Sequence, residues 1–411
     1  MFSTINRRKK NENYEPILLF DIGSGSVAGA ITLIFKDKPP QIIYSAREAI
    51  SFGQGATEAR LVAGKHAALN EVISRLRKDG LPVFAKYSRG HQNFDRAVCF
   101  LSSPWHFSRT SQVNLTKKGG FVLTEEKLKG LLRDEERKLE NEISGGDEVG
   151  LKKTAKITDR RIQSSALNGY KVRQVIGRRC NEFSMSLFQS AVYDEIIEKI
   201  NHSIQAGFHL ENVEIHSFTV AFADAVKKIQ PSSGSRILMD VTGQVTDIYI
   251  VRRGEIRDCV SIPFGRHTLI RSVAKKLNVP VSVAHSSLKI FLANKGDVKF
   301  RNEIEKEIIE LREKWRTMFR EAMNQVAEKA LTPRDLFLTA DEDTAMFFIS
   351  ILKMEKPALS HVVDDRFRIH NFGVEYMKGL CGFGGFKTQP DPFLAIGAFF
   401  ESQTLRGIAV V

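Results

Sequence analysis

The sequence has few cysteines and no long apolar run, and these two absences limit what the protein can be. Its four cysteines, Cys99, Cys180, Cys259 and Cys381, lie far apart, with no CxxC pair and no histidine at ligand spacing. We therefore expect neither a disulfide framework nor a zinc site, and a reducing cytoplasm is the expected compartment. Charged residues interrupt every apolar run well before the length that crosses a bilayer. The opening stretch, MFSTINRRKKNENYE, lacks the pattern of a secretory signal.

Acidic residues are too few to balance the basic ones. The 411 residues include 61 Lys and Arg against 48 Asp and Glu, which gives a net charge of +13. This excess of positive charge favours an anionic partner. A lysine-rich surface that is simply solvated would give the same net charge. No helix-turn-helix, OB or RRM signature accompanies the charge, so we expect no specific nucleic-acid partner. The one tight basic run, at 7–10, lies in a predicted flexible tail that can contact a membrane surface.

One pattern occurs twice and indicates the organisation of the chain. Residues 17–35 predict an apolar strand, an acid, a small turn and a second apolar strand, and residues 235–252 repeat this order. A third strand is predicted after each unit, at 41–48 and at 256–264. Because 411 residues exceed one ordinary core, the repeat predicts two related α/β domains.

Between the two units the composition changes to that of an α+β insert at 114–172. A helix with a hydroxyl cap and early acids begins at Thr124, and Asn168-Gly169 predicts a hairpin. Elsewhere, apolar residues at helical spacing predict a helix over 66–80, ended by Gly80, and a long helix over 301–330.

The two turns, each led by an aspartate, suit a nucleotide held between two related domains. Turn amides can point at phosphate oxygens, and one Asp on each side can hold the hydration shell of a bound Mg²⁺. Candidates for these roles are Asp21, Gly23, Ser24, Gly25 and Ser26 in the first turn, and Asp240, Thr242, Gly243, Thr246 and Asp247 in the second. A plain hairpin is the alternative interpretation of each turn.

In this order the motifs resemble the actin-like superfamily. LLFDIGSGS resembles its first phosphate motif and LMDVTGQVTDIYI its second. Within the superfamily the chain resembles FtsA and its relative PilM. FLSSPWHFSRT and RIQSSALNGYKV resemble the SHS2-type insert of FtsA. SFTVAFADAV resembles the first helix that connects the domains, and DPFLAIGAFF resembles the final helix, which returns to the first domain.

The resemblance implies a two-domain actin-like (ribonuclease H-like) α/β fold, with duplicated mixed sheets and an inserted α+β SHS2-type subdomain. The predicted division is a basic tail at 1–15, subdomain IA at 16–92 and 184–232, the insert at 93–183, subdomain IIA at 233–268 and 331–385, subdomain IIB at 269–330, and a last helix returning to IA at 386–411.

The resemblance also implies ATP and Mg²⁺ as cofactors. It assigns phosphate binding to Gly23, Ser24, Gly25, Ser26, Thr242, Gly243 and Thr246. It assigns the metal, bound through water, to Asp21 and Asp240, with Asp247 as a further candidate. The residues that it places on the adenosine side are Thr339 and Ala340. Two departures leave ATP binding open. Thr242 and Gln244 replace glycines of the second loop, and Ala340, Asp341 and Glu342 replace those of the adenosine motif. Substitute glycines are present at 382, 384 and 385.

The function implied is a non-enzymatic cell-division scaffold similar to FtsA, which recruits division proteins such as FtsZ at the cytoplasmic face of the membrane and self-associates into dimers or filaments. The alternative is a PilM-like adaptor whose partner is the cytoplasmic tail of an inner-membrane protein. Because the last segment, TLRGIAVV, lacks an amphipathic helix, membrane contact is expected to be indirect or through the basic tail. A sugar-kinase activity has little support, since we find no aspartate for the role of catalytic base.

Overall fold

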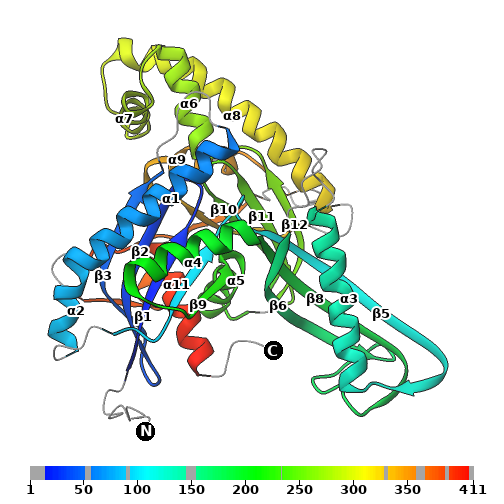
Figure 1. Cartoon of the computed structure of the whole chain (residues 1–411). Coiled ribbons are helices and arrows are strands. Elements are labelled where there is room, and N and C mark those ends of the chain that lie inside the picture. Colours follow the sequence, from blue (N-terminus) through cyan, green and yellow to red (C-terminus); the bar gives the residue numbers. More distant parts are fainter. Residues whose placement is uncertain are drawn as a thin grey trace, which may run out of the picture.

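The computed structural model describes residues 14–50, 57–88, 93–144, 154–232, 234–327, 332–357, 366–384 and 388–406 (Figure 1). In these residues two mixed sheets, one inserted antiparallel sheet and the surrounding helices make up the molecule. The predicted basic tail at 1–15 lies outside the described residues except for Tyr14 and Glu15, and the segment TLRGIAVV lies outside them after Arg406.

The first sheet has the strand order β15-β3-β2-β1-β4-β9. Its members are β1 (Tyr14–Ile22), β2 (Ser26–Phe35), β3 (Gln41–Ala49), β4 (Ala97–Leu101), β9 (Val213–Ser217) and β15 (Gly382–Phe383). The first three strands pair antiparallel, and β4 and β9 join them in parallel. One face packs against α1 (Glu58–Arg75), α2 (Leu81–Tyr87) and α4 (Asp194–Phe208). The strands are apolar on both faces because helices cover both.

The second sheet repeats this arrangement in the order β12-β11-β10-β13-β14. Its strands are β10 (Arg236–Val241), β11 (Thr246–Arg252), β12 (Glu255–Ile262), β13 (Asp335–Ala340) and β14 (Arg368–Asn371). Its helices are α6 (Arg266–Leu277), α7 (Val281–Leu292), α8 (Val298–Ala327) and α9 (Glu342–Leu352). Again three antiparallel strands are followed by two parallel ones, so the predicted duplication is confirmed.

A shared core joins the two sheets. The helices α5 (Phe218–Ile229) and α11 (Pro392–Leu405) lie between them, with the short α10 (Val374–Met377) beside α11. Leu19 and Phe100 from the first sheet and Leu238 and Phe337 from the second belong to one buried cluster with these helices. The two predicted connecting segments therefore form helices that bury apolar side chains against both domains.

The insert is a separate α+β lobe that projects from the body (Figure 1). Its sheet has the order β5-β8-β6-β7, made of β5 (Phe107–Val122), β6 (Ala155–Leu167), β7 (Tyr170–Lys171) and β8 (Arg179–Tyr193), and packs against α3 (Glu125–Ser144). The hairpin predicted at Asn168-Gly169 is confirmed, and both residues have positive φ, 51° and 82°. The boundary predicted at residue 183 falls inside β8, which continues from the lobe into the body.

The helix that was expected to end at Gly80 continues past it. A π-helical turn, Leu76–Gly80, joins α1 to α2. Gly80 serves close packing instead, because a Cβ there would lie 2.9 Å from side-chain atoms of Ile31 and Tyr44.

The helix predicted over 301–330 is confirmed as α8, which buries the face that carries Ile304, Ile308, Leu311 and Trp315. Within the described ranges, no helix combines the length and the apolar character that crossing a bilayer requires.

Candidate functional site

The first turn, between β1 and β2, is a tight hairpin whose backbone groups bond within the protein. The amide of Gly23 donates to the carbonyl of Ser26 over 3.1 Å, and the carbonyl of Gly25 accepts the amide of Ile50 over 2.9 Å. The Gly23 carbonyl accepts the indole N–H of Trp105 over 2.8 Å. The Gly23 amide, which a phosphate-binding turn would point at its ligand, therefore already has a partner.

The second turn, between β10 and β11, is bonded in a similar way. The amide of Thr242 donates to the carbonyl of Val245 over 2.9 Å. The first amides of α6 point at this turn: Arg266 donates to the carbonyl of Thr242 over 3.0 Å, and His267 to that of Gly243 over 2.7 Å. Amides at a helix N-terminus lack intrahelical partners and often bind anions. Here the carbonyls of the turn fill that role.

The two turns touch each other across the domain boundary. The Ser24 hydroxyl donates to Thr242 Oγ1 over 3.0 Å and accepts the amide of Gln244 over 3.0 Å. A Cβ on Gly243 would lie only 2.5 Å from the backbone nitrogen of Gly25 and 2.6 Å from the carbonyl carbon of Ser24. Backbone atoms thus fill the space between the turns, and Gly243 is the residue that permits the close approach.

Arg47, from β3, occupies the cleft beside these turns and binds its acids. Its guanidinium donates to Asp21 over 2.9 Å, to the hydroxyl of Ser26 over 2.6 Å and to Asp391 over 2.8 and 3.0 Å. Asp391 also caps α11 by accepting two amides of its first turn at 3.0 and 3.1 Å. A guanidinium with planar donors suits such carboxylates, so Arg47 supplies the positive charge in this part of the cleft.

The two aspartates that lead the turns are buried and hold protons unusually tightly. Burial, with a smaller contribution from the nearby charge of Asp247, raises the pKa of Asp240 to about 8. Burial also raises the pKa of Asp21, to about 7, although the Arg47 guanidinium opposes this change. Asp240 accepts a hydrogen bond of 2.8 Å from the hydroxyl of Thr339. Protonation of Asp240 and the guanidinium of Arg47 thus limit the negative charge in the cleft near neutral pH.

Asp240→Asn should flatten the dependence of stability on pH. The pKa of Asp240 in the folded protein, about 8, exceeds the ordinary value of 3.8, so its contribution to stability is lost as pH rises between these values. Asparagine keeps the acceptor for Thr339 but does not ionise. The free energy of unfolding should fall between pH 6 and pH 9 in both proteins. The fall should be smaller in the variant than in the wild type, by at least about 1.4 kcal/mol. Denaturant titration at the two pH values measures the fall in stability, and a variant at an exposed position, Asp37→Asn, is the control. An equal fall in Asp240→Asn and in the wild type would contradict the prediction.

The structure brings most predicted site residues to one cleft and leaves the others beside it. Those that border the cleft or bond across it are Asp21, Gly23, Ser24, Gly25, Ser26, Asp240, Thr242 and Gly243. Thr246 and Asp247 bond inside the second domain, to the Phe264 carbonyl over 2.7 Å and the Ser261 hydroxyl over 2.6 Å. On the predicted adenosine side, Thr339 bonds Asp240, and Ala340 ends β13.

Of the acids that replace the adenosine-side glycines, Asp341 pairs with Arg266, which also binds Asp343 two residues further on. The Arg266 guanidinium lies 3.4 Å from Asp341 and donates to Asp343 over 2.7 Å. Asp341 also faces the first turn, because its Oδ2 lies 3.5 Å from the position of a Cβ on Gly25. Burial raises the pKa of Asp341, and Arg266 opposes this rise. The acidic side chain therefore stands where a glycine would leave room for a nucleotide.

The substitute glycines near the C-terminus lie at the edge of the first sheet. The amide of Gly382 donates to the carbonyl of Pro40 over 2.9 Å, and that of Gly384 to the carbonyl of Ile42 over 2.8 Å. Both amides thus extend the sheet beside β3 and do not point into the cleft. Gly385 lies outside the described residues.

A magnesium-bound triphosphate does not fit this closed cleft. The cavity between the turns has a volume of about 20 Å³, which is room for about one water molecule. Two of the turn donors that would meet phosphate, the Gly23 and Gln244 amides, already bond to Ser26 and Ser24. Across the described ranges, no three His, Cys, Asp or Glu side chains converge as metal ligands. We therefore assign no role to ATP or Mg²⁺ in this conformation.

Sequence patterns did not indicate the two residues that complete the cleft. Arg47 sits in a strand and meets Asp391, which lies 344 positions later in the chain. Asp391-Pro392 before an apolar run is a recognisable helix start, so Asp391 could be expected as a cap. Nothing local identifies its partner.

The insert is fastened to both domains through β6. Arg161 donates to both carboxylate oxygens of Asp224 in α5, over 2.8 and 2.9 Å. Gln163 bonds both the amide and the carbonyl of Ile256 in β12, over 2.6 and 2.8 Å. Because one strand of the lobe holds elements of both domains, the lobe resists their separation.

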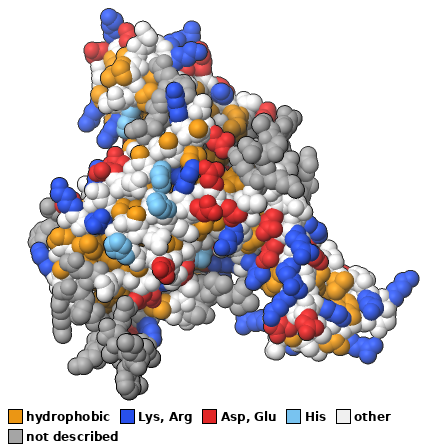
Figure 2. Space-filling model, viewed as in Figure 1, with side chains coloured by type: hydrophobic (Ala, Val, Ile, Leu, Met, Phe, Trp, Pro, Cys, Tyr) orange, Lys and Arg blue, Asp and Glu red, His pale blue; other side chains and the backbone are white. Residues whose placement is uncertain are grey.

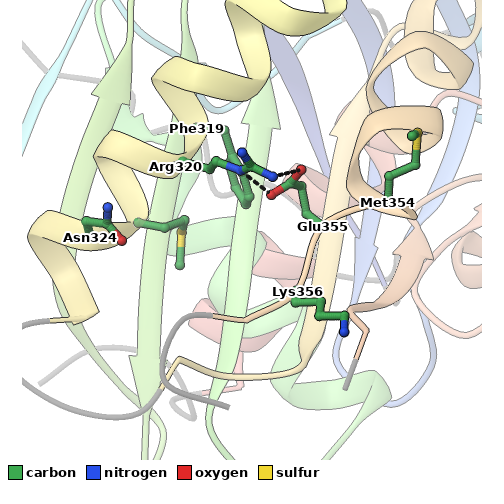
Figure 3. A pocket seen from close by; sticks show the side chains of 7 residues that line it. Phe319, Arg320, Asn324, Met354, Glu355 and Lys356 are labelled. Carbon is green, nitrogen blue, oxygen red and sulfur yellow. Dashed lines mark hydrogen bonds and ion pairs between the residues drawn. The ribbon is translucent and has the colours of Figure 1, made fainter. Parts of the chain in front are cut away.

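A larger hollow of about 430 Å³ lies at the end of α8 (Figure 3). Phe319 and Met323 from α8 and Met354 beyond α9 contribute apolar surface. Its one acid, Glu355, is bonded by Arg316 and by Arg320, the latter over 2.8 and 3.2 Å. This ion-pair cluster occupies the one acid of the lining, while Lys356 lines the hollow without an ion pair among the described residues.

Comparison with known proteins supports the fold without a close relative. No family model and no curated protein matches the chain. A structure of the PilM–PilN type IV pilus biogenesis complex matches with a TM-score of 0.58 and 12% identity, covering 96% of this chain and 98% of that one. The ethanolamine utilization protein EutJ from Carboxydothermus hydrogenoformans gives a TM-score of 0.41 at 12% identity, covering 95% and 90%. A Bacteroides thetaiotaomicron protein with an actin-like ATPase fold gives 0.38 at 10%, covering 90% and 96%.

The chain therefore has the two-domain actin-like fold, as the sequence predicted. It is similar to PilM over nearly its whole length, the insert included. At 12% identity this similarity shows the fold alone. The particular likeness to FtsA, and the SHS2-type identity of the insert, stay predictions.

Proposed function

We propose that this protein is a PilM-like adaptor, a non-enzymatic scaffold that holds a segment of a partner protein during assembly of a type IV pilus or a related secretion machine. The observation that carries the proposal is the closed cleft. Ser24 bonds Thr242 and Gln244 across it, and Arg47 neutralises its acids. Phosphoryl transfer needs a positioned phosphate chain and a base beside an acceptor, whereas a scaffold needs a fixed surface.

Two further observations support an adaptor. The similarity to PilM includes the insert, and PilM was solved in a complex with PilN. The insert here is held to both domains by Arg161 and Gln163, so a partner bound at the lobe meets a rigid body. The partner we propose is the cytoplasmic tail of an inner-membrane protein, which places the adaptor in the cytoplasm at the inner face of the membrane.

A division scaffold similar to FtsA, which recruits FtsZ and self-associates into dimers or filaments, is the other function that this fold permits. None of the similarities reported above favours it. The two functions predict different defects when the gene is removed, and one experiment separates them.

Deletion of the gene in its host should abolish surface pili in electron micrographs while cells divide at normal length. Complementation with Asp240→Asn should restore pili fully, because no Mg²⁺-nucleotide depends on this carboxylate in the proposed adaptor. Immunoblotting checks that the variant accumulates normally. Filamentous cells that keep their pili would overturn the proposal in favour of a division scaffold. Failure of Asp240→Asn alone would keep the adaptor but reject its independence of nucleotide.

A further inference from the structure

The free end of the insert carries a concentration of positive charge. Residues 116–129 and 172–182 hold seven Lys and Arg against three Asp and Glu, an excess of four. Backbone bonds hold the two segments together, from the Leu123 amide to the Arg178 carbonyl over 3.1 Å and from the Gly177 amide to the Leu123 carbonyl over 2.8 Å. Figure 2 shows Lys and Arg side chains gathered on the lobe that the insert forms.

Four of these seven cations have no partner in the part of the chain that the structure describes, unlike cations nearer the body. Within the described residues of this end of the lobe, four exposed cationic side chains make no hydrogen bond or ion pair: Lys117, Lys118, Arg173 and Arg178. Closer to the body, Arg109, Arg160 and Arg161 are each paired with an acid. Unpaired cations therefore stand together at the end of the lobe, whereas these three arginines near the body are neutralised.

Apolar side chains are exposed among these cations. Val122 is 42% exposed and Ile176 37%. Val122 lies opposite Arg179 in the β5–β8 ladder, and Ile176 directly precedes the Gly177 that bonds Leu123. Of the three acids at this end, Glu125 pairs with Lys129, so only Glu126 and Glu182 are left to offset the other cations. Cations and shallow apolar side chains therefore share one protruding surface.

We propose that this basic tip, defined as Lys117, Lys118, Val122, Ile176 and Arg178, docks on an anionic membrane surface. A membrane is an extended negative plane, which accepts separate cations and shallow apolar side chains together. A projecting end can reach such a plane, whereas an acidic peptide is ordinarily bound by a cluster of arginines, and two of the three cations of the tip are lysines. Single-stranded nucleic acid would call for a groove with several stacking aromatics, whereas Tyr170 is the one exposed aromatic side chain among the described residues of this end. The inference does not depend on the proposed function.

Co-sedimentation of the full chain with vesicles tests the inference. The wild type should bind phosphatidylglycerol-containing vesicles, bind pure phosphatidylcholine vesicles far more weakly, and dissociate as salt is raised. Since each cation near an anionic surface contributes about fivefold in binding, the triple variant Lys117→Glu/Lys118→Glu/Arg178→Glu should bind at least about 100-fold more weakly. Its thermal midpoint should stay that of the wild type, because these side chains have no partners to lose.

The matched control reverses three exposed lysines of α8, as Lys299→Glu/Lys306→Glu/Lys314→Glu, and so gives the same net charge. It should keep most vesicle binding, because the effect belongs to the tip and not to total charge. Equal binding by the two triple variants would overturn the proposal, and so would equal binding of the wild type to neutral vesicles. Tip-dependent binding to duplex DNA without vesicle binding would overturn it in favour of a nucleic-acid surface.

Discussion

Replacing Gly243 with alanine should force the two turns apart and lower the free energy of unfolding by about 3 kcal/mol. The added Cβ would lie 2.5 Å from the nitrogen of Gly25 and 2.6 Å from the carbonyl carbon of Ser24. Both are backbone atoms of hydrogen-bonded turns, so neither can move away as a flexible side chain can. Separation would also break the bonds from Ser24 to Thr242 and Gln244.

Denaturant titration measures the stability, and hydrogen exchange at the Gln244 amide reports the separation itself, since that amide donates to Ser24 over 3.0 Å. The matched control is Gly23→Ala, whose nearest contact would be the Ser26 carbonyl at an ordinary 3.4 Å. Gly23→Ala should lower the free energy of unfolding far less than Gly243→Ala does. In an open nucleotide cleft the two variants would differ little before nucleotide is added. A Gly243→Ala protein as stable as the wild type would therefore contradict the closed cleft.

The duplicated architecture could be predicted from the sequence because its signals are local. Strands β1, β2, β10 and β11 are almost continuously buried, so they appear as apolar runs on either side of small turns. The same turn chemistry made the Asn168-Gly169 hairpin predictable. Strand β5 was not predicted, because most of its side chains are only partly buried or exposed and its sequence shows no clear alternation.

The closure of the cleft could not be predicted, because it depends on contacts between distant residues. Ser24 meets Thr242 across 218 positions, and Arg47 meets Asp391 across 344. Glycine in both turns is equally consistent with a phosphate between them and with the turns touching each other. The departures at Thr242 and Gln244 did indicate where a nucleotide would lose room, and both residues now bond to Ser24.

Removing the charge of Arg47, as Arg47→Ala, should destabilise the protein by about 3–5 kcal/mol at neutral or higher pH, the usual cost of breaking a buried ion pair. Asp21 and Asp391 would lose their shared partner, and their side chains are only 5% and 13% exposed. Burial already raises the pKa of Asp21 to about 7 with Arg47 present. The loss should therefore be smaller at pH 5, where protonation neutralises Asp21, than at pH 8, where a buried carboxylate stands unpaired.

The matched control is Arg160→Ala, which removes an exposed arginine paired with Glu136 in the insert and should cost about 0–1 kcal/mol. Asp21 and Asp391 both accept from the same nitrogen of Arg47, over 2.9 and 3.0 Å. Millimolar Mg²⁺ should therefore restore part of the stability of Arg47→Ala, because a divalent cation can bridge two freed carboxylates. It should leave the wild type unchanged, with or without ATP. A rise in the thermal midpoint of the wild type with Mg²⁺-ATP would mean that the cleft opens to a nucleotide, and that Arg47 does not replace the bound cation.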